Sequence, residues 1–136
     1  ALPIFLLFQI FSGWSYHDSG DYESALKIFE KAEAYFKSKN EASRLKIATW
    51  TVARCLRSLN RVEDALSKQM QLLKDFESVG ETDGYVFEEI GECLILLNRK
   101  DEAKPYFAKA YEELSQDGFL ADNEPERLKR LKQLSD

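Results

Sequence analysis

A short polar turn, then an alanine, then large apolar residues at helical spacing, occurs three times in this chain. The alanines are Ala25, Ala65 and Ala103, which lie 40 and 38 residues apart. A pattern that recurs with a period of roughly 20 to 50 residues is typical of stacked repeats, which bury their apolar faces against one another. The spacing therefore predicts a repeating scaffold rather than a fold wrapped around one closed centre.

The elements of this scaffold are predicted to be helices. Apolar residues recur every three or four positions, and no stretch alternates strictly between apolar and polar residues. The expected helices cover 3–18, 22–38, 41–59, 62–78, 85–97 and 101–115, and a last helix begins near Pro125. Short links within each pair favour antiparallel neighbours. We therefore expect an all-α fold, an α-solenoid of three antiparallel helix pairs with a C-terminal capping helix.

The domain organisation follows from this pattern. The 136 residues have the length of a single domain. The expected repeats cover 3–39, 41–79 and 83–116, and the capping helix covers 124–135. Its apolar stripe is Leu128, Leu131 and Leu134. Its basic side chains are expected to face the solvent: Arg127, Lys129, Arg130 and Lys132.

Charge and hydropathy argue against a nucleic acid or a membrane as the partner. The net charge is −5, and a surface that binds nucleic acid or an anionic membrane needs a basic footprint. The segment Leu2–Phe11 is almost wholly apolar but too short to span a membrane, which takes about 20 residues. It is interpreted either as a buried first helix or as a surface that pairs with another chain. The second interpretation predicts a homodimer through Leu2–Phe11.

Two cysteines, Cys55 and Cys93, occupy the same place in the second and third repeats. Equivalent positions in successive repeats are expected to lie too far apart for a disulfide, whose Cα atoms must approach within about 7 Å. We therefore expect two buried thiols, which is compatible with a reducing compartment and a cytoplasmic location.

No pattern typical of catalysis or of a metal site is present. His17 is the only histidine, and Glu88, Glu89 and Glu92 lack histidine or cysteine companions at metal-ligand spacing. The chain has no phosphate-binding glycine loop, no Cys-x-x-Cys pair and no nucleophile elbow. The sequence predicts a protein that is not an enzyme and that holds no metal and no cofactor.

The three units resemble tetratricopeptide repeats. The first unit matches the signature of that family at Gly13, Tyr16, Gly20, Tyr22, Ala25, Phe29 and Ala32. The second matches it at Ala53, Leu56, Ala65 and Leu72, and the third at Gly91, Leu94, Ala103, Phe107 and Ala110. Gln69 replaces the usual aromatic residue of the second unit, and the usual proline after each second helix is absent. The period exceeds the common one of about 34 residues. It is similar to the longer-helix subtype of peptide-sensing regulators and kinesin light chains.

The resemblance implies a concave groove, lined by the first helix of each pair, that holds an extended peptide or a helix of a partner. Carried over by position, the groove residues are Ile10, Trp14, His17, Trp50, Arg54, Arg57, Glu88, Glu92 and Ile95. One subclass of the family grips a C-terminal carboxylate with lysine and asparagine. Ile10 and Trp14 stand where that subclass has its first two such residues, so this activity is not expected.

Each of these residues also has a structural interpretation. Trp14 and Trp50 suit binding anchors, because tryptophan buries a large area, but they equally suit the core. Arg54 and Arg57 share a helix face. They could grip a carboxylate, or they could pair with the glutamates at 88 and 92. His17 stands next to a turn, where a histidine is more often a surface or capping residue than a catalyst.

The expected function is that of a non-catalytic scaffold, which binds a peptide segment or a helix of a partner protein in its concave groove. Two alternatives remain open. One is a peptide-sensing regulatory domain, which the long repeat period favours. The other is self-assembly through the apolar N-terminal helix. The partner is expected to be a protein or a peptide and not a nucleic acid.

Overall fold

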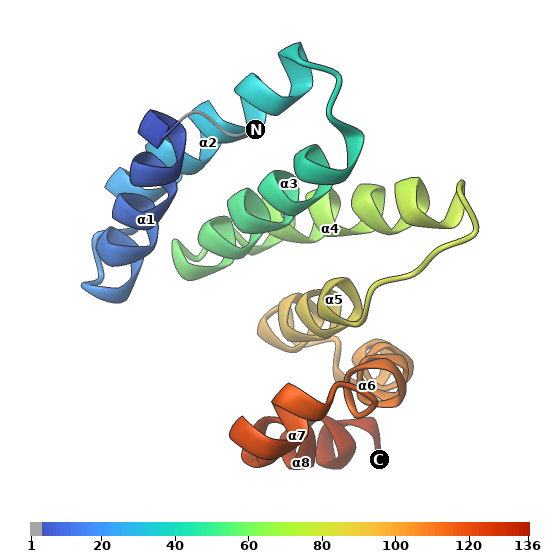
Figure 1. The fold of residues 1–136 in the computed structure, drawn as a ribbon. Helices are drawn as coiled ribbons and strands as arrows, with labels where there is room; N and C mark the ends of the chain where they lie inside the picture. Colours follow the sequence, from blue (N-terminus) through green and yellow to red (C-terminus); the bar gives the residue numbers. More distant parts are fainter. Residues whose placement is uncertain (1–3) are drawn as a thin grey trace. The chain divides into compact units, whose positions relative to one another are not determined.

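The computed structural model describes the backbone of residues 4–136 and the side chains from Gln9 onward (Figure 1). Within this range helices are the only regular secondary structure, and no strand is present. The helices are α1 (Ile4–Asp18), α2 (Tyr22–Ser38), α3 (Ala42–Ser58), α4 (Val62–Glu77), α5 (Gly84–Leu96), α6 (Lys100–Leu114), α7 (Gly118–Asn123) and α8 (Pro125–Ser135). The predicted all-α fold of consecutive helix pairs with a C-terminal capping helix is confirmed.

One short helix, α7, was not expected from the sequence. Its first turn is held by Asp117, whose side chain accepts hydrogen bonds from the backbone N–H of Phe119 (2.9 Å) and of Leu120 (3.4 Å). Aspartate is among the residues that best satisfy the free N–H groups at a helix start. Leu120 is buried, so α7 adds apolar surface to the C-terminal part of the chain.

The turn inside each helix pair has the same geometry. Gly20, Asn60 and Asn98 occupy equivalent positions and have φ angles of 89°, 61° and 60°. Each donates its N–H to the carbonyl three residues earlier, and the next residue donates to the carbonyl five residues earlier. Glycine and asparagine tolerate this left-handed conformation best, which explains their presence in these three turns.

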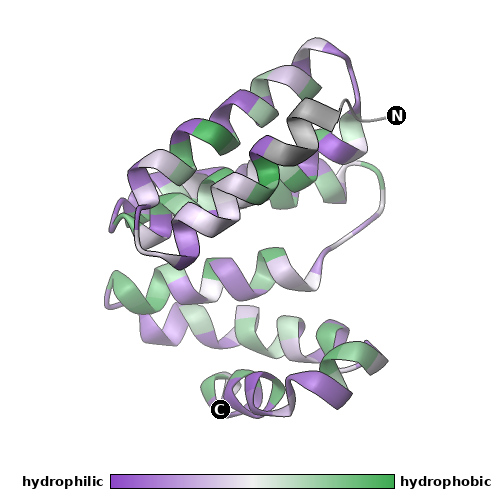
Figure 2. Cartoon of the chain, turned by 60° about the vertical axis from the view of Figure 1, so that its left-hand side comes forward, coloured by the Kyte–Doolittle hydropathy of each residue, from purple (hydrophilic) through white to green (hydrophobic). Residues whose placement is uncertain are grey.

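The chain divides into two compact units, one ending at Lys68 and the other beginning at Gln69. In the first unit α1 packs on α2, and α2 packs on α3. In the second, α5 packs on α6, α6 on α8, and α7 on α8. Hydrophilic and hydrophobic residues are interspersed along the helices, as expected for helices with one buried face (Figure 2). The repeat alanines Ala25, Ala65 and Ala103 are all buried.

Two glycines allow an aromatic ring to lie directly against a helix backbone. A Cβ atom on Gly13 would lie 2.6 Å from Cε1 of Phe29, and one on Gly91 would lie 2.8 Å from Cε1 of Phe107. These distances are far below a normal contact, so only glycine fits beside these rings. The same two positions of the second repeat carry Ala53 and Gln69, both fully buried. In the second repeat, alanine replaces the glycine at position 53, and glutamine replaces the phenylalanine at position 69. The added Cβ atom and the missing aromatic ring therefore occur together.

The two buried thiols predicted at Cys55 and Cys93 are confirmed, and neither cysteine forms a disulfide. Of the predicted C-terminal stripe, Leu128 and Leu131 are buried, and Leu134 is half-buried. Among the described residues, none of the helices combines the length and the apolar character needed to cross a membrane. Most of the segment Leu2–Phe11, through which a homodimer was expected, lies outside the described residues, since no side chain before Gln9 is described.

Candidate functional site

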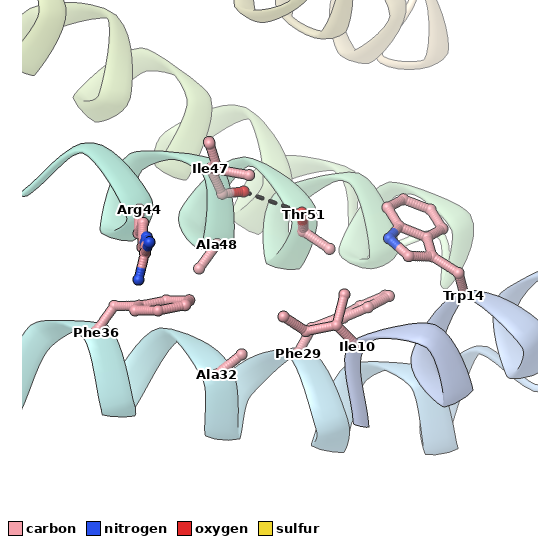
Figure 3. Close-up of a pocket in the computed structure, with 9 residues that line it drawn as sticks. All are labelled: Ile10, Trp14, Phe29, Ala32, Phe36, Arg44, Ile47, Ala48 and Thr51. Atoms are coloured by element: carbon pink, nitrogen blue, oxygen red, sulfur yellow. Dashed lines mark hydrogen bonds between the residues drawn. The ribbon is translucent and has the colours of Figure 1, made fainter. Parts of the chain in front are cut away.

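The first unit contains an apolar groove with a volume of about 270 Å³ (Figure 3). Three helices, α1, α2 and α3, contribute to its walls. The lining residues are Ile10, Trp14, Phe29, Ala32, Phe36, Arg44, Ile47, Ala48 and Thr51. Seven of these nine side chains are hydrocarbon or aromatic, and a largely apolar pocket with few polar groups is typical of a binding site.

The floor of the groove comes from α2. Phe29, Ala32 and Phe36 are spaced three and four residues apart, so they share one helix face. In Figure 3 these side chains point toward α3, where Ala48 lies above them. Ala32, Phe36 and Ala48 form one buried cluster, against which Ile10 packs. The same periodicity that places these residues in the core therefore also builds the groove.

The α1 side of the groove is formed by Ile10 and Trp14, which lie one helical turn apart. The Trp14 ring is half-buried, with its centroid 5.0 Å from that of Phe29 and 5.4 Å from that of His17. Trp14 thus packs against the core with part of its ring and lines the groove with another part. The two interpretations of Trp14 offered by the sequence are compatible with each other.

The polar groups of the groove are Arg44 and Thr51. Nη1 of Arg44 lies 3.6 Å from Oε2 of Glu41, in an ion pair whose two side chains are each about 40% exposed. The hydroxyl of Thr51 donates to the backbone carbonyl of Ile47 at 2.9 Å, so it is already satisfied within α3. Ile47 itself is 68% exposed. The groove therefore offers an apolar surface with one cationic group at its edge.

A short polar chain links the C-terminal ends of α1 and α3. Arg54 donates from Nη1 to Oγ of Ser58 at 2.7 Å, and Oγ of Ser58 lies 2.8 Å from Nε2 of His17. Arginine can only donate, so Oγ of Ser58 accepts from Arg54, and its hydroxyl can donate to Nε2 of His17 when the proton of the neutral ring is on Nδ1. Burial, reinforced by the nearby charge of Arg54, lowers the pKa of His17 below its ordinary value of 6.5. His17 is therefore a neutral structural link near the α1–α2 turn.

The other predicted groove residues of α3 are Trp50, Arg54 and Arg57. All three are half-buried, and none of them lines the apolar groove. Their assignment to a binding surface remains a prediction. Of the predicted site residues, Ile10 and Trp14 line the groove. His17 and Arg54 are connected through the hydroxyl of Ser58.

In the second unit, the two predicted groove glutamates form ion pairs with arginines of α8. Arg127 donates from Nε to Oε2 of Glu88 at 2.9 Å and from Nη2 to Oε1 of the same carboxylate. Arg130 donates from both Nη atoms to Glu92. The hydrogen bond with Glu88 is the main cause that raises the pKa of Arg127. The third predicted residue, Ile95, is half-buried.

These ion pairs correct one expectation. Arg127 and Arg130 were expected to face the solvent with the lysines of α8, yet both guanidinium groups turn toward α5. Arg127 also lies over the ring of Tyr85, with its Cζ atom 5.3 Å from the ring centroid. These pairs could not be predicted from local spacing, because the two members of each pair are 38 and 39 residues apart.

Sequence reasoning missed the α3 part of the groove. Arg44, Ile47 and Thr51 were not among the predicted site residues. A signal was present for Ile47, which is apolar but falls outside the spacing of the buried residues Ala48 and Val52. Within the residues that the structure describes, no group of three or more histidine, cysteine, aspartate or glutamate side chains could hold a metal ion.

Comparison with known proteins adds one finding. The family model described as "Tetratricopeptide repeat" matches residues 9–39, which span most of α1 and all of α2, and residues 86–113, which span most of α5 and α6. The intervening helices α3 and α4 lie outside the matched segments. They carry Gln69 in place of the aromatic residue at 29 and 107. No curated protein matches the chain.

Proposed function

Because the chain is a helical repeat protein of the tetratricopeptide type, we propose that it binds a segment of a partner protein in the α1–α3 groove. Tetratricopeptide repeats are generally protein–protein interaction modules, and the family is typically a non-catalytic scaffold. The proposal goes further by naming the surface that makes the contact. The observation that carries it is the apolar groove between α1, α2 and α3.

The composition of the groove indicates the kind of segment that fits. Its floor of Phe29, Ala32 and Phe36 offers no hydrogen-bond donor or acceptor from a side chain, so it favours an apolar side chain of the partner. Arg44 at the edge favours a carboxylate close to that apolar group, because an arginine–carboxylate pair is a strong charge-assisted contact. The preferred ligand is a peptide or helix with a large apolar anchor and an acidic neighbour.

Trp14 provides a direct optical probe of this groove. The chain has two tryptophans, so the substitution Trp50→Phe leaves Trp14 as the only one. Peptides for the assay would be selected from a random display library against the intact chain. Binding in the groove is expected to change the emission of Trp14, because the occupant removes water from its ring.

Substitutions at the groove edge separate groove binding from binding elsewhere. We expect Ile47→Asp to weaken the selected peptides at least tenfold, since it puts a charge into an apolar contact. Arg44→Glu is expected to weaken peptides with an acidic neighbour several-fold and to spare neutral ones. Val79→Asp is the matched control, because Val79 is also exposed and lies outside the groove. Peptides that bind Ile47→Asp as tightly as the parent chain would show that the groove is not the binding surface.

A further inference from the structure

Glu41 stands at the N-cap position of α3, but its side chain does not cap the helix. In three other helices this position holds an aspartate whose side chain accepts backbone N–H groups of the first turn, at Asp21, Asp83 and Asp117. The backbone of Glu41 is fixed without such a bond. Its N–H donates to the carbonyl of Phe36 at 3.2 Å, and its carbonyl accepts from the N–H of Leu45 at 2.8 Å. The carboxylate of Glu41 therefore takes no part in starting the helix.

The carboxylate lies instead beside Arg44, the cationic residue at the groove edge. Nη1 of Arg44 lies 3.6 Å from Oε2 of Glu41, which fits an ion pair but is too long for a hydrogen bond. This oxygen is shielded from solvent, and no group of the described residues donates a hydrogen bond to it. The pair of Arg99 with Glu102, also three residues apart, is hydrogen-bonded twice, at 2.7 and 2.8 Å. Glu41 and Arg44 thus form a loose pair.

A carboxylate on a ligand can bind Arg44 more closely than Glu41 does. In Figure 3 the Arg44 side chain points from α3 toward Phe36, at one end of the apolar floor. A guanidinium group has five N–H donors in a fixed fork, and it binds a free carboxylate through two parallel hydrogen bonds. Such a carboxylate must displace that of Glu41, because two negative groups beside one guanidinium repel each other.

We propose that Glu41 determines how strongly the groove distinguishes acidic from neutral ligands, by holding Arg44 until a ligand carboxylate replaces it. This role rests on the proposed function of the groove. The exchange costs little, since an ion pair whose two side chains are each about 40% exposed contributes little to stability. Specificity often depends on such a repulsive group as well as on an attractive one.

Pairs of matched peptides measure this selectivity. Each peptide selected from the display library is made with either glutamate or glutamine beside its apolar anchor, and the ratio of the two affinities is determined. Glu41→Gln keeps the shape of the side chain and removes its charge. We expect it to strengthen the glutamate peptides about two- to fivefold and to leave the glutamine peptides unchanged. Glu63→Gln is the matched control, since Glu63 is exposed in the first turn of α4 and its loss changes the net charge equally.

The effect of Glu41→Gln is expected to depend on Arg44. In a chain that also carries Arg44→Gln, Glu41→Gln should have little effect on the ratio of affinities, because the two residues act as a pair. A double-mutant cycle measures this coupling. Thermal unfolding of the same variants distinguishes it from a structural effect. A merely structural role of Glu41 would weaken both peptides alike and lower the midpoint of unfolding.

The outcomes separate this role from the function of the groove. If Ile47→Asp binds the peptides as tightly as the parent chain does, the groove is not the binding surface, and the role of Glu41 fails with it. If Ile47→Asp weakens the peptides but Glu41→Gln leaves the ratio of affinities unchanged, the groove assignment stands and the role of Glu41 is wrong. An equal gain from Glu63→Gln would also overturn that role, because net charge would then explain the preference.

Discussion

The carboxylate of Glu88 on α5 and the guanidinium of Arg127 on α8 form an ion pair with two hydrogen bonds, which fastens the last helix to the second unit. The side chain of Glu88 is only 8% exposed, so Arg127 compensates for the burial of its carboxylate. The pair Arg130–Glu92 lies beside it, with the arginine half-exposed. The apolar stripe of α8 packs this helix on α6, and the two arginines fix its position along α5.

Removing Arg127, the cation that pairs with the buried Glu88 carboxylate, is expected to be costly. Arg127→Gln leaves the Glu88 carboxylate buried without its cation and should lower the free energy of unfolding by about 2–4 kcal/mol. Arg130→Gln removes a more exposed pair and should cost about 0–1 kcal/mol. Urea unfolding measures both. Equal effects of the two substitutions would mean that burial of Glu88 does not determine the strength of the pair.

The two close glycine–phenylalanine contacts make a prediction about packing. Gly13→Ala forces a methyl group against Phe29, and Gly91→Ala forces one against Phe107. Each substitution should destabilise the chain by about 1–3 kcal/mol through overpacking, despite the better helix propensity of alanine. Gly118→Ala is the control, because a Cβ atom there meets no atom within 4 Å. Thermal or urea unfolding compares the three, and a neutral Gly13→Ala would show that the ring of Phe29 can move aside.

The lowered pKa of His17 predicts a dependence of stability on pH. The unfolded chain binds a proton near pH 6.5, whereas the folded chain binds it only at a lower pH. The contribution of His17 is therefore fully present above pH 6.5 and is lost as the pH falls through the folded pKa. Because His17 is the only histidine, its NMR titration is free of overlap. His17→Gln should remove this part of the pH dependence, and a titration midpoint above 6.5 would contradict the argument.

Gln69 predicts a stabilising substitution. Its side chain is fully buried, and neither amide atom has a hydrogen-bond partner among the described residues. Gln69→Met keeps a similar shape and removes the unsatisfied polar groups, which should raise the free energy of unfolding by about 1–3 kcal/mol. Gln71→Met, at an exposed position of the same helix, is the control and should change little. A loss of stability in Gln69→Met would indicate that the amide has a partner within the folded chain.

The period of the alanines and the spacing of the apolar residues were sufficient to predict the helices, their pairing and the cap. These features depend on neighbours close in sequence, such as the left-handed turns at Gly20, Asn60 and Asn98. The spacing of the apolar residues also predicted which face of α2 is buried, because Phe29, Ala32 and Phe36 lie on one side of a helix with about 3.6 residues per turn. For the same reason Ile10 and Trp14 could be named as candidate groove residues in advance.

Only the tertiary structure decided which side chains of different helices meet. It placed Arg44 and Ile47 at the groove edge, joined His17 to Ser58, and assigned Glu88 to Arg127. Each of these contacts joins residues on separate helices, up to 41 positions apart in the chain. Helical periodicity defines the direction of a side chain around its own helix. It does not define the rotation and depth at which the next helix packs, because close packing of many side chains determines these together.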